Sequence, residues 1–323
     1  MAKTVILTGF MGTGKTAVGH EVARRLDVPF VDMDAEIEAR AGKPIPRIFS
    51  EDGETAFREM EAALIRDLSA SRDGWAELAA GAVIATGGGT LVDVDDPRTE
   101  IERLQAARRE AYLAIPWHVD TTGLAVHQVA ARVMALAQAR ELSVRHPNGS
   151  YQIRIGEGLL DHAGGALRAA GVPPGSSVAL VSNDRVAPLY ATRVEDALRT
   201  TGLRPFRCVI PDGEQYKTLA TVASLYDQFL ASRLDRSGIV LSLGGGVVGD
   251  VAGFAAASFM RGVPFGQIPT SLLAMVDASV GGKTGVDLPQ GKNLVGAFKQ
   301  PLCVTIDPAV QETLEAAELR SGM

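Results

Sequence analysis

The sequence predicts an α/β fold with mainly parallel sheets in both halves of the chain. Short apolar segments alternate with segments whose apolar residues recur at helical spacing. Two glycine-rich segments, at residues 9–16 and 244–250, each follow a predicted strand and open a predicted helix. Such alternation is typical of helices that cover the faces of a parallel sheet. We therefore expect a P-loop NTPase-type domain followed by a Rossmann-like, doubly wound α/β domain.

The first half is expected to hold three short strands, at residues 5–7, 30–31 and 83–85. Each is a short apolar run, as in strands that are buried on both faces. The helices expected around them lie at residues 15–26, 35–41, 54–69, 99–110 and 124–139. Apolar residues recur at helical spacing in 15–26, 54–69 and 124–139, and 99–110 is a charged helix.

The second half continues the alternation. Strands are expected at residues 152–155, 177–181, 206–210, 238–243 and 265–268, and helices at 159–170, 186–200 and 219–232. The segment 141–150 contains Pro147-Asn148-Gly149, which is interpreted as a linker or as the start of a hairpin. The predicted domains are therefore 1–140 and 151–323, joined by a linker at 141–150.

The composition excludes several classes of function. The 323 residues carry a net charge of −6 and no basic stripe, so nucleic acid is a poor candidate partner. No apolar segment is long enough for a signal peptide or a membrane span, and Cys208 and Cys303 cannot build a disulfide framework. We expect a cytoplasmic protein that acts on small molecules, without membrane partners. No histidine follows His162, so the second half offers no imidazole as a base or zinc ligand.

The segment GFMGTGKT at residues 9–16 fits G-x-x-x-x-G-K-[ST] between a strand and a helix, which is the context that a phosphate-binding loop requires. Its main-chain N–H groups can point at phosphate oxygens, and the helix N-terminus adds partial positive charge. Lys15 can reach the β- and γ-phosphates, and the Thr16 hydroxyl can ligate Mg²⁺. The candidate ATP-binding residues are Gly12, Thr13, Gly14, Lys15 and Thr16.

Further polar residues follow the next two strands. Asp32 and Asp34 could serve Mg²⁺ and a substrate hydroxyl, or Asp32 could simply cap a helix. Arg58 alone is interpreted as a surface charge. The glycines at 87–89 could let a ligand approach the backbone or could form an ordinary turn.

Together these residues resemble shikimate kinase, through GFMGTGKT, VDMD, IFSEDGETAFREME and TGGG within residues 1–89. The resemblance implies ATP-dependent 3-phosphorylation of shikimate. Lys15 and Asp34 are then the candidate catalytic residues, and Asp32 would act near Mg²⁺ with Thr16. The implied substrate-binding residues are Asp34, Arg58, Gly87, Gly88, Gly89 and Arg108.

After residue 89 the chain departs from that family. The strand and the mobile lid that follow the triple glycine in the family are missing, and residues 98–110 resemble the segment after the lid. Because a lid excludes water and completes the charge clamp, we expect weakened binding and slow or absent phosphoryl transfer.

The second glycine-rich segment, GGGVVGD at 244–250, suits the binding of a pyrophosphate, or else it is a close helix–strand packing turn. The polar loop DGEQYK at 212–217 follows another strand and alone reads as a solvated turn. Between residues 259 and 298, charged and amide side chains lie among glycines and apolar residues. Such groups usually face a ligand, although a solvated loop is the alternative.

These segments resemble 3-dehydroquinate synthase, through PDGEQYKTL, LGGGVVGDVAGFAAASFMRGV, QIPTSLLAMVDASVGGKTGVD and GKNLVGAF. The resemblance implies NAD-dependent conversion of 3-deoxy-arabino-heptulosonate 7-phosphate to 3-dehydroquinate with loss of phosphate, and a possible homodimer. Lys283 and Asn293 are the implied catalytic residues, and Arg261, Lys283 and Asn293 would face the substrate. The implied NAD-binding residues are Asp212, Gly213, Glu214, Gln215, Tyr216, Lys217, Gly246, Val247, Val248, Gly249, Asp250, Thr270, Ser271, Asp277, Lys283 and Lys292.

The family continues beyond a segment like that at 321–323, with a metal-binding glutamate and a helical domain that carries two metal-binding histidines. We expect the Zn²⁺ or Co²⁺ ligands of the full synthase to be absent from this chain. The sequence therefore predicts binding of NAD but no stoichiometric binding of zinc.

Three hypotheses follow. The leading one is a bifunctional shikimate-pathway enzyme whose two sites are both incomplete in this chain. The second is a single P-loop small-molecule kinase with a NAD-binding module. The third is a non-catalytic nucleotide-binding remnant, which the missing lid and metal domain would favour.

Overall fold

The structure is a computed structural model that describes residues 4–70, 78, 81–87, 106, 108, 111–112, 114–315 and 318–319. The chain divides into two compact units. The first unit comprises Met1–Ala114 and Asp120–Ala137, and the second comprises Ile115–Val119 and Gln138–Met323. Among the described helices, none combines the length and the apolar character needed to cross a bilayer.

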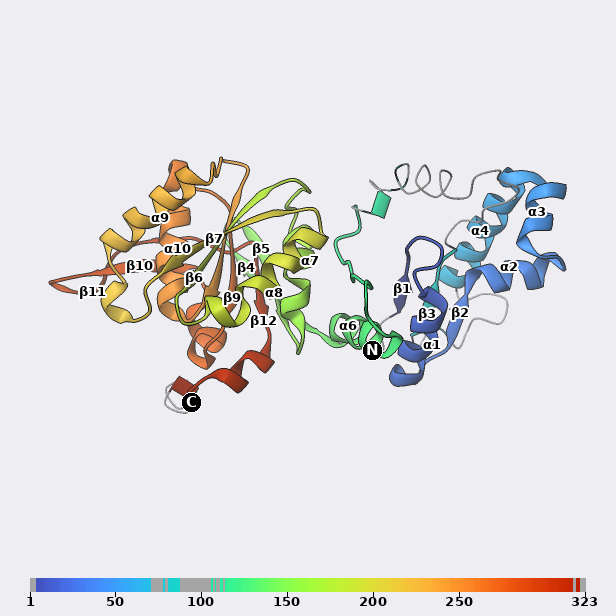
Figure 1. Ribbon diagram of the computed structural model, residues 1–323, viewed down its shortest axis with the longest axis horizontal. Helices are drawn as coiled ribbons and strands as arrows, with labels where there is room; N and C mark the ends of the chain where they lie inside the picture. Colours follow the sequence, from blue (N-terminus) through green and yellow to red (C-terminus); the bar gives the residue numbers. More distant parts are fainter. Residues whose placement is uncertain are drawn as a thin grey trace. The chain divides into compact units, whose positions relative to one another are not determined.

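The first unit contains a three-stranded parallel sheet with β3 in the centre (Figure 1). Val83 of β3 lies opposite Val5 of β1 on one side and Phe30 of β2 on the other. The strands are β1 (Val5–Leu7), β2 (Phe30–Asp32) and β3 (Val83–Ala85), and the helices are α1 (Lys15–Leu26), α2 (Met33–Ala41), α3 (Ile45–Glu51), α4 (Gly53–Ala70) and α6 (Val126–Gln138).

Helix α1 has the bounds that the sequence predicts, because its pattern and its end signals agree. Val18 and Val22 are buried at helical spacing. The helix ends where Asp27 takes a left-handed conformation, with φ of 53°, and its N–H donates to the Ala23 carbonyl. Of the helix expected at 99–110, residues 99–105, 107, 109 and 110 lie outside the described residues, and Arg108 is helical.

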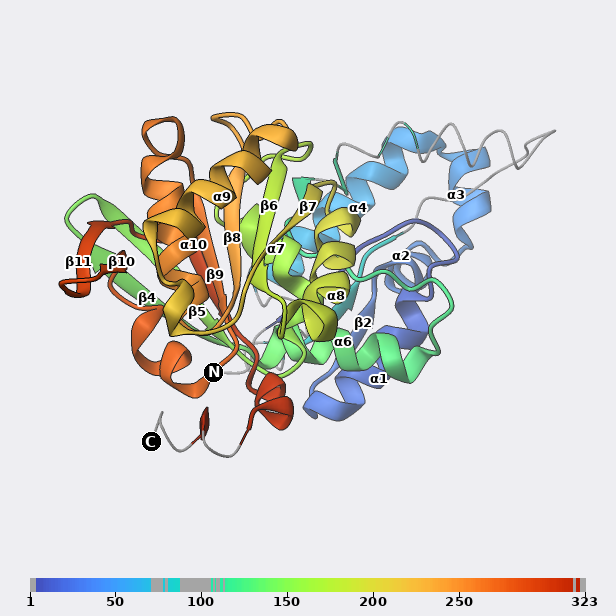
Figure 2. The same cartoon turned by 60° about the vertical axis from the view of Figure 1, so that its left-hand side comes forward.

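The second unit contains a seven-stranded sheet in the order β4-β5-β12-β9-β8-β6-β7, parallel except for the β4–β5 pair. One core packs α7 and α8 on one face, and a second core packs α9 and α10 on the other, as Figure 2 shows. The strands are β4 (Arg140–His146), β5 (Gly149–Ile155), β6 (Ser177–Asn183), β7 (Arg204–Ile210), β8 (Ile239–Gly244), β9 (Phe265–Pro269) and β12 (Cys303–Ile306). The α-helices are α7 (Ala163–Ala169), α8 (Ala187–Thr200), α9 (Leu219–Ala231) and α10 (Gly246–Ser258). Shorter helical segments are η2 (Leu159–His162), η3 (Glu214–Tyr216), η4 (Phe259–Arg261), η5 (Ala274–Ala278) and η6 (Pro308–Thr313).

The segment 141–150 is a β-hairpin and not a linker. Strands β4 and β5 pair from Arg140–Ile155 to His146–Gly149, with Pro147-Asn148 at the turn. Of the two interpretations of Pro-Asn-Gly, the hairpin is the correct one. This hairpin is the first part of the seven-stranded sheet, so it belongs to the second unit.

The region 259–298 also contains structure that the sequence pattern did not predict. Strands β10 (Lys283–Leu288) and β11 (Gly291–Phe298) form a separate antiparallel hairpin. Its glycines allow close pairing, since a side chain on Gly296 would lie 2.2 Å from the Thr284 carbonyl oxygen. Two of its large apolar side chains are exposed, Leu294 at 59% and Phe298 at 83%.

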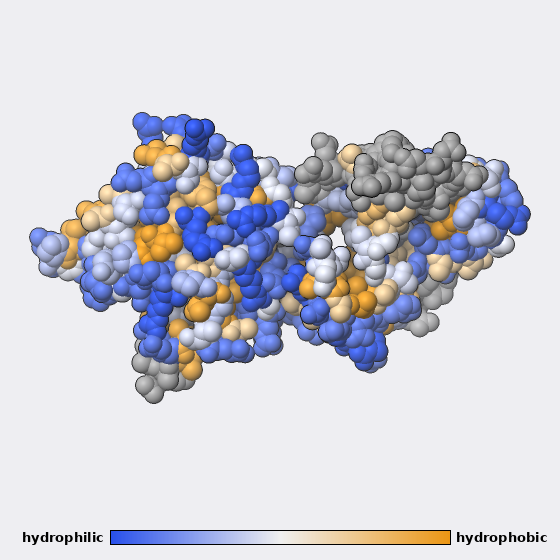
Figure 3. Space-filling view, viewed as in Figure 1, coloured by the Kyte–Doolittle hydropathy of each residue, from blue (hydrophilic) through white to orange (hydrophobic). Residues whose placement is uncertain are grey.

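Figure 3 shows small apolar areas scattered among polar ones on the face that it draws.

Candidate functional site

The glycine loop between β1 and α1 has the geometry of a phosphate cradle. Gly12 and Gly14 take left-handed φ values of 74° and 80°, which side chains other than glycine adopt only at a cost. A side chain on either residue would have no neighbour within 4 Å among the described residues. Gly14 is the N-cap of α1, so the first amides of the helix directly follow the loop.

Lys15 lies folded over this loop. Its ammonium donates to the carbonyl oxygens of Gly9 at 2.8 Å and Phe10 at 3.0 Å. Burial lowers the pKa of Lys15, the nearby Asp34 and Asp32 raise it, and Arg108 lowers it further. Asp34, Asp32 and Arg108 thus lie near enough to Lys15 to influence the charge of its ammonium.

Thr16 and Asp32 bring two oxygen donors together at the end of β2. The Thr16 hydroxyl donates to Asp32 Oδ2 at 2.7 Å. Asp32 Oδ1 accepts from the amides of Asp34 at 3.1 Å and Ala35 at 3.4 Å, so it also caps α2. Asp32 therefore performs the structural role that the sequence left open, and it also contacts the hydroxyl expected to ligate Mg²⁺. Oxygen donors of this kind fit Mg²⁺.

Asp34 and Gly87 are in direct contact, at the ends of neighbouring strands. A side chain on Gly87 would lie 2.5 Å from Asp34 Oδ1 and 3.3 Å from Glu61 Oε1. A side chain here would require the Asp34 carboxylate to shift. Burial raises the pKa of Asp34, and the neighbouring Asp32 and Glu61 raise it further. Gly88 and Gly89 lie outside the described residues.

Arg58 does not stand alone on the surface. It donates to Glu61 at 2.6 Å and to Glu54 at 3.2 Å, and its guanidinium lies 5.5 Å from the centre of the Phe57 ring. Glu61 thus links Arg58 to the Asp34–Gly87 contact. Glu61 was not predicted from the sequence, although an acid three residues after an arginine on a helix is a detectable signal.

The second glycine turn joins β8 to α10. The first intrahelical hydrogen bond runs from the Gly249 amide to the Gly245 carbonyl, so the amides of 246–248 precede the helical ladder. A side chain on Gly245 would lie 3.4 Å from Ser271 Oγ, and the Thr270 amide donates to the Gly244 carbonyl. The structure therefore brings Thr270 and Ser271 to the turn.

Two other glycines here are required for packing. A side chain on Gly244 would lie within 3.0 Å of Val248, and one on Gly253 would lie 2.3 Å from Thr284. The close helix–strand packing that the sequence left as an alternative is thus also present. The two interpretations concern different glycines and do not compete.

Lys217 joins the loop 212–217 to two other predicted residues. Its ammonium lies 2.6 Å from Asp250 Oδ2 and donates to Asn293 Oδ1 at 2.5 Å. Burial raises the pKa of Asp250, and the hydrogen bond and charge of Lys217 oppose this. Nearby, Lys292 pairs with Glu214 at 2.9 Å in an exposed position.

The rest of this loop is held by residues at the end of β6. Asn183 donates to Asp212 Oδ1 at 2.5 Å, and the Asp212 amide donates to Asp184 Oδ1 at 3.1 Å. Asn183 was not predicted, although a polar residue at the carboxyl end of a parallel strand is a usual sign of a site. A cavity of about 520 Å³ lies beside the loop, lined by residues 214–215, 217–220 and 287–289.

Three predicted residues do not contact the side chains of the loop 212–217. Arg261, Asp277 and Lys283 are exposed, and their side chains make no hydrogen bond or ion pair with other described residues. The roles predicted for these three residues toward substrate and cofactor stay predictions. Within the described ranges, no three His, Cys, Asp or Glu side chains gather in a way that fits zinc or cobalt, so no chemical step is assigned to such an ion here.

Two family models match separate parts of the chain. The shikimate kinase model matches residues 11–98, and the model for the N-terminal part of 3-dehydroquinate synthase matches residues 207–321. The chain thus carries a segment similar to shikimate kinase, called the kinase segment below, and a segment similar to the N-terminal part of 3-dehydroquinate synthase, called the synthase segment. Both resemblances, and the α/β fold class, are confirmed.

Relatives of the synthase segment are closely similar. The 3-dehydroquinate synthase of Microcystis aeruginosa is 50% identical over 182 residues, 56% of this chain and 49% of that protein. That of Citrifermentans bemidjiense is 49% identical over 185 residues, 57% of this chain and 51% of that protein. The chain thus spans about half the length of the curated relatives that it matches.

A solved structure extends the comparison of the synthase segment. 2-Deoxy-scyllo-inosose synthase, complexed with carbaglucose-6-phosphate, NAD⁺ and Co²⁺, superposes with a TM-score of 0.53 at 25% identity. The match covers 57% of this chain and 50% of that one.

Proposed function

We propose that this chain contributes two activities of the shikimate pathway. The first is ATP-dependent 3-phosphorylation of shikimate, and the second is NAD-dependent conversion of 3-deoxy-arabino-heptulosonate 7-phosphate to 3-dehydroquinate. The observation that supports this most strongly is the pair of glycine turns, one in each unit, whose helix-opening amides lie at the carboxyl end of a parallel strand.

In the kinase segment, the Lys15 ammonium would exchange its bonds to the Gly9 and Phe10 carbonyls for phosphate oxygens. Thr16 and Asp32 would hold Mg²⁺, which neutralises phosphate charge when bound. Asp34 would accept the proton of the attacking hydroxyl, a role that a carboxylate of raised pKa suits. Arg58 would bind the substrate carboxylate, in exchange for one of its two glutamates.

In the synthase segment, the amides of 246–248 would bind the pyrophosphate of NAD, with Ser271 beside them. NAD supplies a hydride acceptor when bound. Lys217, Asp250 and the loop 212–217 would hold the cofactor, and Lys283 and Asn293 would orient the substrate. The related 2-deoxy-scyllo-inosose synthase was solved in complex with NAD⁺, which supports NAD as the cofactor of this segment.

The kinase part is tested by changing Lys15→Ala. We expect this variant to lose affinity for MgATP by about tenfold or more, because a charge-assisted bond to phosphate is lost, and to keep its affinity for NAD⁺. Isothermal titration calorimetry measures both, and a coupled assay with ATP and shikimate measures turnover. The matched control is Lys43→Ala, which removes a lysine paired with Glu51 and Asp52 at the surface. Unchanged ATP binding in Lys15→Ala would contradict the role of the loop.

A further inference from the structure

Lys217 is a buried cation that connects three elements of the second unit. The residue is only 5% exposed, and it follows η3 at the end of the loop 212–217. Its ammonium reaches Asp250 on α10 and Asn293 on β11. An ammonium has three donors, and these two contacts leave the third for a bound molecule. Any ligand that approaches this loop therefore competes with, or adds to, the bonds that hold Asn293.

Asp287 closes these contacts into a ring. Its amide donates to the Lys217 carbonyl at 2.8 Å, and its Oδ1 accepts from the Asn293 amide at 2.7 Å. Asn293 in turn accepts from the Lys217 ammonium. Asp287 is thus bonded to both ends of the Lys217–Asn293 contact. It sits at the register shift of the hairpin, between Val286 and Leu288, where the strand can turn its main chain toward the loop.

The ring also holds an unusual backbone conformation. Asn293 has φ of 57°, in the left-handed region, which asparagine tolerates better than most residues. The bond from its amide to Asp287 fixes the peptide that leads into this conformation. Without that acceptor, the Asn293 side chain would lose the support that aims it at Lys217. A second link between the same two segments, from Lys292 to Glu214, is exposed and so contributes less.

We propose that Asp287 is a positioning residue that couples the loop 212–217 to Asn293, so that dinucleotide binding at the loop orders the substrate-facing hairpin. This inference depends on the proposed synthase function. Coupling of two sites is reciprocal, so a substrate that fixes Asn293 would also strengthen cofactor binding. Because the ring is built from short hydrogen bonds between a buried loop residue and the hairpin, the two segments move together.

Hydrogen exchange followed by mass spectrometry tests the coupling on the full chain, with and without saturating NAD⁺. In the wild type we expect NAD⁺ to slow the exchange of amides at 291–298 by about fivefold or more. In Asp287→Ala we expect NAD⁺ to bind within about threefold of its wild-type affinity. We expect NAD⁺ to leave the exchange at 291–298 unchanged, because the coupling between the two sites is lost. Asp287→Asn keeps an acceptor oxygen and should restore the protection.

The matched control is Asp235→Ala, which removes an exposed aspartate that accepts from the Ser237 and Gly238 amides in the same unit. It should leave the protection of 291–298 intact. If Asp287→Ala fails to fold, Asn293→Gly keeps the left-handed backbone, removes the acceptor for Lys217, and should lose the protection in the same way. Full NAD⁺-dependent protection in Asp287→Ala or in that glycine variant would overturn the inference. A wild type that does not bind NAD⁺ would instead refute the proposed synthase function.

Discussion

At the scale of single residues, the kinase segment concentrates negative charge where the substrate is expected. Burial raises the pKa of Asp34, the nearby carboxylates of Asp32 and Glu61 raise it further, and Lys15 only partly offsets these effects. A carboxylate in such a place is useful as a proton acceptor and unfavourable for folding. The site is therefore expected to reduce the stability of the unit that contains it.

Asp34→Asn should separate these two effects. The pKa of Asp34 is higher in the folded protein than its ordinary value, so the wild type loses stability as the pH rises from about 4 through that raised pKa. The amide of the variant does not ionise, so the stability of the variant does not fall for this reason. The variant should thus melt above the wild type at pH 7, and the difference should shrink toward pH 4. Its phosphoryl transfer should fall by about 100-fold or more. Thermal denaturation across this pH range measures the first effect. Asp27→Asn, at an exposed helix end, is the control, and an equal effect of both changes would contradict the account.

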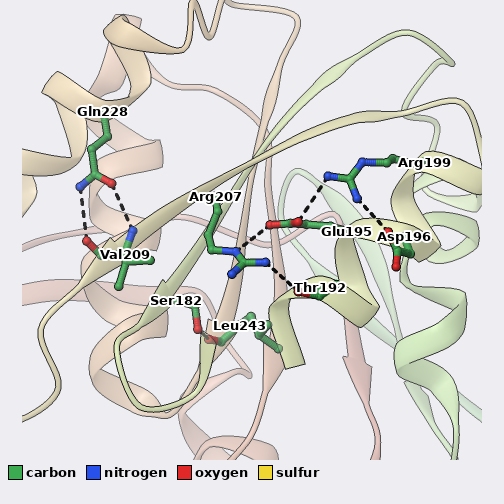
Figure 4. Close-up of polar contacts among 9 residues, drawn as sticks. All are labelled: Ser182, Thr192, Glu195, Asp196, Arg199, Arg207, Val209, Gln228 and Leu243. Carbon is green, nitrogen blue, oxygen red and sulfur yellow. Dashed lines mark hydrogen bonds and ion pairs between the residues drawn. The ribbon is translucent and has the colours of Figure 1, made fainter. Parts of the chain in front are cut away.

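At the scale of elements, β7 is a sheet edge covered by side chains. Among the described strands it pairs only with β6. Gln228 of α9 lies against this edge, where its amide accepts from the Val209 N–H at 3.1 Å and donates to the Val209 carbonyl at 3.5 Å. Arg207, also on β7, donates to Glu195 of α8, which in turn accepts from Arg199 (Figure 4). The two Gln228 bonds occupy main-chain groups with which a strand from another chain would pair.

Gln228→Met should therefore expose the edge. We expect a loss of about 1 kcal/mol in the free energy of unfolding, because two main-chain groups lose their partner, and an increase in self-association. Urea denaturation and sedimentation velocity measure the two effects. Gln138→Met, at an exposed helix end, is the matched control. If Gln228→Met associated no more than Gln138→Met in sedimentation velocity, the prediction that Gln228 protects the edge would be wrong.

The sequence predicted elements best where periodicity and end signals agree, as in α1. It did not predict the β10–β11 hairpin, since glycine-rich segments with scattered charges carry no clear period, and the pairing is decided by close contacts such as Gly296 against Thr284. The same holds for the candidate sites. Motif residues such as Lys15, Thr16 and Asp32 were predictable because each follows a strand or opens a helix. Asp287, Glu61 and Asn183 were missed because their role depends on contacts between segments far apart in the chain.

At the scale of the whole molecule, the chain contains two units, each with its own core and its own glycine turn. The core of the first unit includes Ile37, Ile48 and Leu64, and the second unit packs a core on each face of its sheet. A nucleotide that binds one turn should stabilise the unit that contains it by mass action and leave the other unaffected. We infer that the two glycine turns are independent phosphate-binding sites for two different cofactors.

Differential scanning calorimetry of the full chain tests whether the two sites act independently. We predict two unfolding transitions, one raised by about 5 °C or more by saturating MgATP and the other by a similar amount by saturating NAD⁺. Lys15→Ala should abolish only the shift caused by MgATP. A single transition raised by both nucleotides, or no response to either, would contradict the account.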